Sequence, residues 1–266
     1  MNGLGGAISV ANCAMKKIFQ TEWQDIQFSE FAKLSSTNLA GPEFYQAFYE
    51  TFFGRYQNWG ELSPSWRKTK ETWANFILAR TGPNSRVLSV GCGLGFIEHC
   101  IRAQNPRLDL FIHEVAPSAW RWVGDEFAAQ RKLTGLIPAC LPTGTQFDLV
   151  YLATVDYSLD DDALVGLLAA IRPFLTRTSG QCLLISASFQ DVPKTFAEKA
   201  GSALARIKAF TKTALNMLGL RNCGQFWGWN RTRKEYRVLM QRAGYRDLED
   251  GFIEPKTRAH YWISGR

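Results

Sequence analysis

Apolar and polar positions change along the middle of the chain in a rhythm that predicts strands and helices in turn. Short apolar runs bounded by turn residues predict strands, and the longer stretches between them have apolar positions at helical spacing. The predicted strands are RVLSV, LDLFIHE, a weaker LTGLIPA, FDLVYLAT and GQCLLISAS, with helices over 95–103, 116–132 and 161–175. This alternation predicts an α/β fold with a doubly wound, Rossmann-like sheet.

Both ends of the chain differ from this middle part. Residues 15–80 carry aromatic positions at helical spacing, in FYQAFYETFFGRY and SPSWRKTKETWANFILAR, and predict an N-terminal helical cap over 1–80. After residue 188 the pattern predicts a helical insertion at about 191–225, a helix over 231–244, and a hairpin of two final strands within 245–266. The second predicted domain, 81–266, therefore combines the sheet with this insertion.

The composition is that of a globular protein with free thiols. Hydrophobic residues make up 46% and charged residues 21% of the 266 positions, as in ordinary globular domains. No apolar run reaches the roughly 18 residues that would predict a membrane-spanning helix. The six cysteines are scattered without a CxxC pair, so buried free thiols and a cytoplasmic location are predicted. No metal-binding motif is visible.

The stretch RVLSVGCGLGFIEH has the pattern of a cofactor-binding turn between a strand and a helix. Its glycines, Gly91, Gly93 and Gly95, have the spacing GxGxG, which differs from the GxGxxG of dinucleotide folds. The dinucleotide pattern places a pyrophosphate at the helix start, whereas GxGxG suits a cofactor without phosphates, such as S-adenosylmethionine. Glu114 ends the next predicted strand 23 residues after Gly91, a spacing that suits a carboxylate accepting both ribose hydroxyls.

These motifs resemble those of the class I S-adenosylmethionine-dependent methyltransferases over residues 70–266. VLSVGCGLG is similar to the family's glycine loop, IHEVAPSA to its acidic strand end, FDLVYLATVDYS to its fourth strand and SGQCLLIS to its fifth. The resemblance implies a seven-stranded, mostly parallel sheet whose last strand is antiparallel. It also implies S-adenosylmethionine as the cofactor, held by Gly91, Cys92, Gly93, Gly95, Glu114, Val115, Thr154 and Val155.

Two positions depart from the family pattern. Ser89 stands two residues before the first glycine, where the family usually has an acidic residue that orients the methionyl amino group. Cys140 stands near the third strand, where a carboxylate near the adenine is common. These departures keep open the alternative of a cofactor-binding interaction protein that has lost catalysis.

The residues after the fourth strand are the first candidates for methyl transfer, because ligands of open α/β sheets lie beyond the carboxyl ends of the strands. Asp156 is either the general base or a residue that only begins the following helix, and His260 is a second base candidate. Tyr157 is predicted to stack on the adenosine or the acceptor. Trp59, together with Tyr56 and Trp66, either closes over the sulfonium or belongs to the core of the cap.

The positive charge of the chain is concentrated in one segment. Residues 194–246 contain 12 Lys or Arg and two acids, a net +10, so the rest must sum to −3 to give the total of +7. Trp229 beside Arg231 suits a sugar ring with an acidic group. The amphipathic pattern of 193–220 suits either contact with an anionic membrane surface or a solvated lid helix.

The sequence therefore predicts an S-adenosylmethionine-dependent methyltransferase that O-methylates a sugar or glycan, anionic or lipid-linked. RNA or another small molecule is the alternative acceptor, since a basic surface with interleaved aromatics also suits RNA. Against nucleic acid, no separate RNA-binding module is present, and ATVDYS stands where base amino-methylating enzymes have an NPPY-type loop. The oligomeric state is left open.

Overall fold

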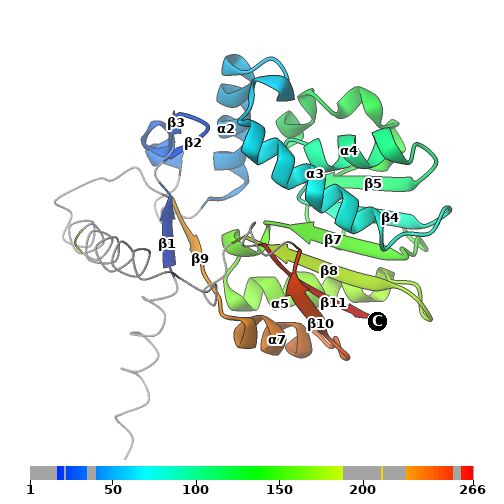
Figure 1. The fold of residues 1–266 in the computed structure, drawn as a ribbon. Helices are drawn as coiled ribbons and strands as arrows, with labels where there is room; N and C mark the ends of the chain where they lie inside the picture. Colours follow the sequence, from blue (N-terminus) through cyan, green and yellow to red (C-terminus); the bar gives the residue numbers. More distant parts are fainter. Residues whose placement is uncertain are drawn as a thin grey trace, which may run out of the picture.

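The computed structural model describes residues 17–20, 22–34, 40–187, 211, 226–253 and 259–265. Its centre is a seven-stranded sheet with the order β10-β11-β8-β7-β4-β5-β6 (Figure 1). The strands are β4 (Arg86–Val90), β5 (Asp109–Glu114), β6 (Lys132–Thr134), β7 (Leu149–Ala153), β8 (Gln181–Ser186), β10 (Glu249–Phe252) and β11 (His260–Gly265). The sheet confirms the predicted Rossmann-like fold.

The strand directions place the ligand-binding edge of the sheet. β4 pairs in parallel with β5 on one side and β7 on the other, so the order of the strands reverses at β4. β11 is antiparallel to both β8 and β10, as predicted for the last strand. In open α/β sheets the crevice for a ligand lies at such a switch point, beyond the carboxyl ends of the strands.

Helices cover both faces of the sheet (Figure 1). α3 (Pro64–Leu78) and α4 (Phe96–Gln104) bury apolar side chains in one cluster with the sheet, and α5 (Asp161–Ile171) and α7 (Arg233–Arg242) do so in the other. Central strands buried on both faces need apolar side chains at nearly every position. Val87 and Leu88 of β4 accordingly lie in opposite clusters, which explains why these strands were recognisable in the sequence.

Residues before the sheet form an aromatic layer over its carboxyl edge. α2 (Pro42–Arg55) and the 3-10 helix Phe28–Leu34 bury Phe28, Phe31, Phe44, Phe48 and Phe52 in a third cluster. The helix predicted from residue 15 onward is wrong for its first part, which forms the strands β1 (Lys17–Gln20), β2 (Glu22–Trp23) and β3 (Ile26–Gln27). β1 pairs with β9 (Phe226–Trp229) from the far end of the chain, a contact that local spacing does not encode.

The helix predicted over 116–132 is also wrong. Three short 3-10 helices, Pro117–Arg121, Gly124–Glu126 and Ala129–Arg131, take its place. Glycine at position 124 disfavours a continuous helix. In addition, side chains of this segment pack in two different hydrophobic clusters. Ala119 packs in the aromatic cluster of the cap, whereas Val123 and Phe127 pack with α4.

Several predictions fall outside the described residues. The helical insertion at 191–225, with its proposed membrane contact, is described only at Thr211, which is helical. The limit between domains at residue 80 stays a prediction. Among the described helices, none combines the length and the apolar character that crossing a membrane requires.

Candidate functional site

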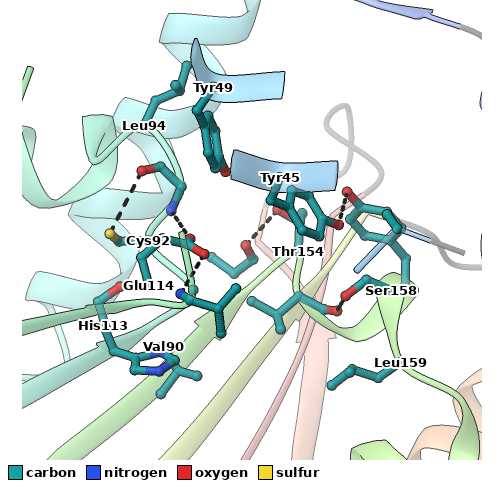
Figure 2. Close-up of a pocket in the computed structure, with 18 of the residues that line it drawn as sticks. Tyr45, Tyr49, Val90, Cys92, Leu94, His113, Glu114, Thr154, Ser158 and Leu159 are labelled. Atoms are coloured by element: carbon teal, nitrogen blue, oxygen red, sulfur yellow. Dashed lines mark hydrogen bonds between the residues drawn. The ribbon is translucent and has the colours of Figure 1, made fainter. Parts of the chain in front are cut away.

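A cavity of about 1040 Å³ opens at the carboxyl ends of β4, β5 and β7. Its wall comes from the glycine loop after β4, the end of β5, the loop after β7, and the cap helices α2 and α3. Small-molecule sites are typically about 300–1,000 Å³, so this cavity has room for a cofactor and an acceptor together. Figure 2 shows Tyr45 and Tyr49 of α2 facing Glu114 and Thr154 across it.

The glycine loop presents backbone atoms without side chains to the cavity. Gly91, Gly93 and Gly95 have φ values of +68°, +58° and +71°, the left-handed conformation that other residues rarely adopt. A Cβ at Gly91 would lie 2.6 Å from Val155, and a Cβ at Gly95 would lie 2.6 Å from Val123. Gly91 and Gly93 line the cavity, whereas Gly95 begins α4 behind the described wall.

Glu114 lies at the end of β5 and is held by the backbone around it. Its Oε2 accepts a hydrogen bond from the Gly93 amide at 2.9 Å, and its Oε1 accepts one from the Val115 amide at 2.8 Å (Figure 2). Burial raises the pKa of this carboxyl, although these backbone hydrogen bonds lower it. The Ala116 amide also donates to Oε1, at 3.4 Å. A carboxylate has about four acceptor sites, so Glu114 keeps acceptor capacity for a hydroxyl in the cavity.

The cofactor residues predicted from the sequence are brought together, except for Gly95. The cavity wall contains Gly91, Cys92, Gly93, Glu114, Val115, Thr154 and Val155. Tyr157, the predicted stacking residue, also lines the cavity, and its hydroxyl lies 3.5 Å from that of Tyr45. The glycine cradle and the available acceptor sites of Glu114 fit the adenosine part of S-adenosylmethionine.

Asp156, the first candidate for the general base, is not part of the described cavity wall. Its buried carboxylate accepts hydrogen bonds from Tyr236 of α7 and from Ser186 Oγ at 2.7 Å. Burial raises the pKa of Asp156, while Tyr236 and Ser186 lower it. The carboxylate thus faces the packing between β8 and α7, and this geometry does not support a base role.

His260 and Arg231 are likewise turned away from the described wall. His260 is buried on β11, and its Nε2 lies 2.9 Å from Asp250 Oδ2. Arg231 is 0% exposed, and its guanidinium donates to Asp161 at 2.8 Å and to the carbonyls of Asp156 at 2.8 Å and Leu159 at 2.6 Å. Arg231 therefore fastens the loop after β7 to the start of α5, where an acidic sugar cannot reach it.

Trp59 and Trp229 are not part of the described wall. Trp59 donates its indole N–H to the Leu94 carbonyl at 3.2 Å and packs on His99 with ring centroids 4.4 Å apart, on the outer side of the glycine loop. Trp229 belongs to β9, where it pairs with Lys17 of β1. Of the predicted acceptor residues, only Tyr157 reaches the cavity within the described structure.

The structure adds wall residues that the sequence did not assign to the site. Phe28, Phe44, Tyr45, Phe48 and Tyr49 form an aromatic wall together with Trp66, which was predicted to close over the sulfonium. The helical spacing of FYQAFYETFFGRY was the available signal, and it was interpreted as part of a helical cap. Two charged side chains, Lys70 of α3 and Glu98 of α4, also line the cavity. Across the described residues, no cluster of three His, Cys, Asp or Glu side chains is placed to bind a metal.

Comparisons with known proteins give structural likeness without sequence likeness. No protein-family model matches the chain, and no curated protein matches it. The structure of human N-acetylserotonin methyltransferase in complex with SAM superposes with a TM-score of 0.53 at 15% identity, over 90% of this chain and 61% of that protein. The mitomycin 7-O-methyltransferase MmcR gives 0.56 at 16% identity, over 91% and 62%.

A shorter protein matches along nearly its whole length. The TehB-like SAM-dependent methyltransferase from Corynebacterium glutamicum gives a TM-score of 0.52 at 15% identity, over 83% of this chain and 98% of that one. By contrast, this chain spans less than two thirds of the N-acetylserotonin and mitomycin enzymes. The chain has the fold of the class I S-adenosylmethionine-dependent methyltransferases, as the sequence resemblance implied.

Proposed function

We propose that this protein binds S-adenosylmethionine in the cavity and transfers its methyl group to the oxygen of a small-molecule acceptor. The observation that carries the proposal is the placement of Glu114 and the glycine loop in one cavity with an aromatic wall. Glu114 would hold the ribose hydroxyls, and the backbone of Gly91 and Gly93 would lie against the cofactor. The cofactor would supply an electrophilic methyl group on a sulfonium.

The aromatic wall suits both the sulfonium and a flat acceptor. Ring faces attract a cation, and Tyr45, Tyr49 and Trp66 contribute such rings to the cavity. The protein's main task would be to align the acceptor behind the methyl group and to exclude water, as in other displacement reactions. The hydroxyls of Tyr45 and Tyr157 would orient the acceptor, because burial raises both pKa values and keeps the hydroxyls protonated.

The charges of the described wall favour an uncharged acceptor over an anionic sugar. Lys70, Glu98 and Glu114 are its charged residues, and no arginine belongs to it. Arg231, on which the prediction of an acidic sugar rests, is bonded to Asp161 and to backbone carbonyls. The N-acetylserotonin and mitomycin methyltransferases act, by their names, on small molecules, which supports an acceptor of that class.

The first test is calorimetric titration with S-adenosylmethionine of the wild type, Glu114→Ala and a control, Glu71→Ala, at a half-exposed residue of α3 outside the described cavity wall. We expect micromolar binding by the wild type and the control, and none by Glu114→Ala. Methyl transfer from labelled cofactor would then be compared between flat aromatic hydroxyl compounds and anionic sugars. Folded wild-type protein that fails to bind the cofactor would refute the proposal, and transfer to the sugars alone would refute the acceptor class.

A further inference from the structure

Glu98 is a buried carboxylate at the cavity that the fold does not fully satisfy. It lies in the first turn of α4, is 1% exposed, and belongs to the cavity wall. Its Oε1 accepts hydrogen bonds from Ser89 Oγ and from the Tyr151 hydroxyl, both at 2.6 Å. Its Oε2 is buried and has no hydrogen-bond partner among the described residues.

A buried carboxylate oxygen without a hydrogen-bond partner costs free energy unless a bound ligand donates the missing hydrogen bond. Buried polar atoms nearly always have hydrogen-bond partners, and an unsatisfied charged group costs more than a neutral one. Burial raises the pKa of Glu98, whereas Ser89, Tyr151 and the charge of Lys70 lower it. The unpaired Oε2 therefore favours a ligand that brings a positively charged hydrogen-bond donor into the cavity.

Lys70 contributes a positively charged side chain to the wall of the same cavity. It projects from α3, and its ammonium lies 3.8 Å from the centre of the Trp73 ring. Its charge acts on Glu98, yet the two described side chains form no ion pair within 4.0 Å. Two separate opposite charges at one wall match the ammonium and carboxylate of an α-amino acid.

The sequence neighbourhood of Glu98 strengthens this assignment. Ser89 is the penultimate residue of β4, at the position where the resemblance places an acidic residue, and its hydroxyl donates to Glu98. The carboxylate missing from β4 is thus replaced in space by one from α4, nine residues later in the chain. Tyr151 lies on β7, the strand that pairs with β4, and its hydroxyl donates to the same Oε1 of Glu98.

We infer that Glu98 binds the α-amino group and Lys70 the carboxylate of the amino-acid part of the cofactor. This assignment rests on the proposed function, since it takes S-adenosylmethionine as the ligand. It makes Glu98 a binding residue that the glycine motif itself does not contain. It also predicts that the two ends of the cofactor are recognised independently, the adenosine by Glu114 and the amino acid by Glu98 and Lys70.

The experiment compares S-adenosylmethionine with 5′-methylthioadenosine, which lacks the amino-acid part, by calorimetry. We expect Glu98→Gln to weaken S-adenosylmethionine binding at least tenfold and to leave methylthioadenosine binding within twofold of wild type. Glu71→Gln, at a half-exposed acid of α3 outside the described cavity wall, should change neither. The double variant Ser89→Asp with Glu98→Gln should recover part of the lost affinity, because it returns a carboxylate to the end of β4.

The outcomes separate this inference from the proposed function. Failure of the wild type to bind either ligand would overturn both. Wild-type binding combined with unchanged cofactor affinity in Glu98→Gln, or an equal loss of both ligands, would overturn the role of Glu98 alone. Circular dichroism would verify folding, and if Glu98→Gln does not fold, Lys70→Met is measured against the same two ligands with the same criteria.

Discussion

The turn at Gly91 offers the sharpest test of how the glycine loop is built. Gly91 has a φ of +68°, and a Cβ there would lie 2.6 Å from Cγ2 of Val155, much closer than an ordinary contact. The variant Gly91→Ala must therefore adopt a disfavoured backbone conformation and displace Val155. Because this loop is part of the cavity wall, the change is expected to weaken both the fold and cofactor binding.

The magnitude follows from three contributions to the free energy of unfolding. A left-handed backbone costs a residue with a Cβ about 1–2 kcal/mol, and crowding in a packed region costs about 1–3 kcal/mol. The reduced entropy of the unfolded chain returns about 0.4–1 kcal/mol. We expect a net loss of roughly 2–4 kcal/mol, which in a domain of this size lowers Tm by roughly 5–15 °C.

The assay is thermal and urea unfolding of Gly91→Ala, Val155→Ala and the double variant. Removing the Val155 methyl groups relieves the crowding but leaves the backbone cost, so we expect the two changes to be coupled by about 1–2 kcal/mol. Gly54→Ala, on α2 with no atom within 4 Å of the added Cβ, is the control and should stabilise by about 0.5–1 kcal/mol. A Gly91→Ala variant as stable as wild type, or a cycle without coupling, would refute the reasoning.

Three further predictions concern side chains around the cavity. Tyr236→Phe removes a donor to the buried Asp156 carboxylate, so we expect a loss of about 1–3 kcal/mol of stability with an unchanged pH profile of turnover. Arg231→Met should cost roughly 2–4 kcal/mol, since it breaks the contact with the partly exposed Asp161, and should leave acceptor KM nearly unchanged. At about pH 8, cofactor binding should take up more protons in the wild type than in Lys70→Met, because a bound carboxylate favours the charged form of a lysine.

The sign of the last prediction follows from the surroundings of Lys70. Burial lowers the pKa of Lys70 to about 7, so most of this amine is neutral at about pH 8 in the free protein. Glu98 and the rings of Trp66 and Trp73 face it, and Glu98 is common to both proteins compared. The difference should vanish at about pH 6, where Lys70 is already charged.

Each of these predictions has a direct measurement. Titrations in phosphate and in Tris buffers report proton uptake as the difference between the two binding enthalpies. If this difference were the same for wild type and Lys70→Met at the higher pH, the lysine prediction would be contradicted. A shifted pH profile in Tyr236→Phe would return Asp156 to the catalytic candidates. A large rise of acceptor KM in a stably folded Arg231→Met would mean that Arg231 reaches the acceptor after all.

The sequence was sufficient to predict the central strands of the sheet and about half of the residues of the candidate site. Parallel strands buried on both faces appear as apolar runs, so β4, β5, β7 and β8 were found within a few residues of their ends. Gly91 and Glu114 were also found, because Gly91 directly follows β4, Glu114 is the last residue of β5, and parallel strands end at one edge. Short-range patterns encode these features, and the structure confirms the fold that they predicted.

Only the tertiary structure decided which side chains face the cavity. Asp156 lies between the cavity residues Val155 and Tyr157 in sequence, and Arg231 follows Gly228 by three positions, yet packing against β8, α5 and α7 turns both side chains away from the described wall. Glu98 and Lys70 come from separate helices and line the same cavity because α3 and α4 pack on the same face of the sheet. Spacing along the chain fixes where a residue emerges, whereas the packing of distant elements fixes the direction of its side chain.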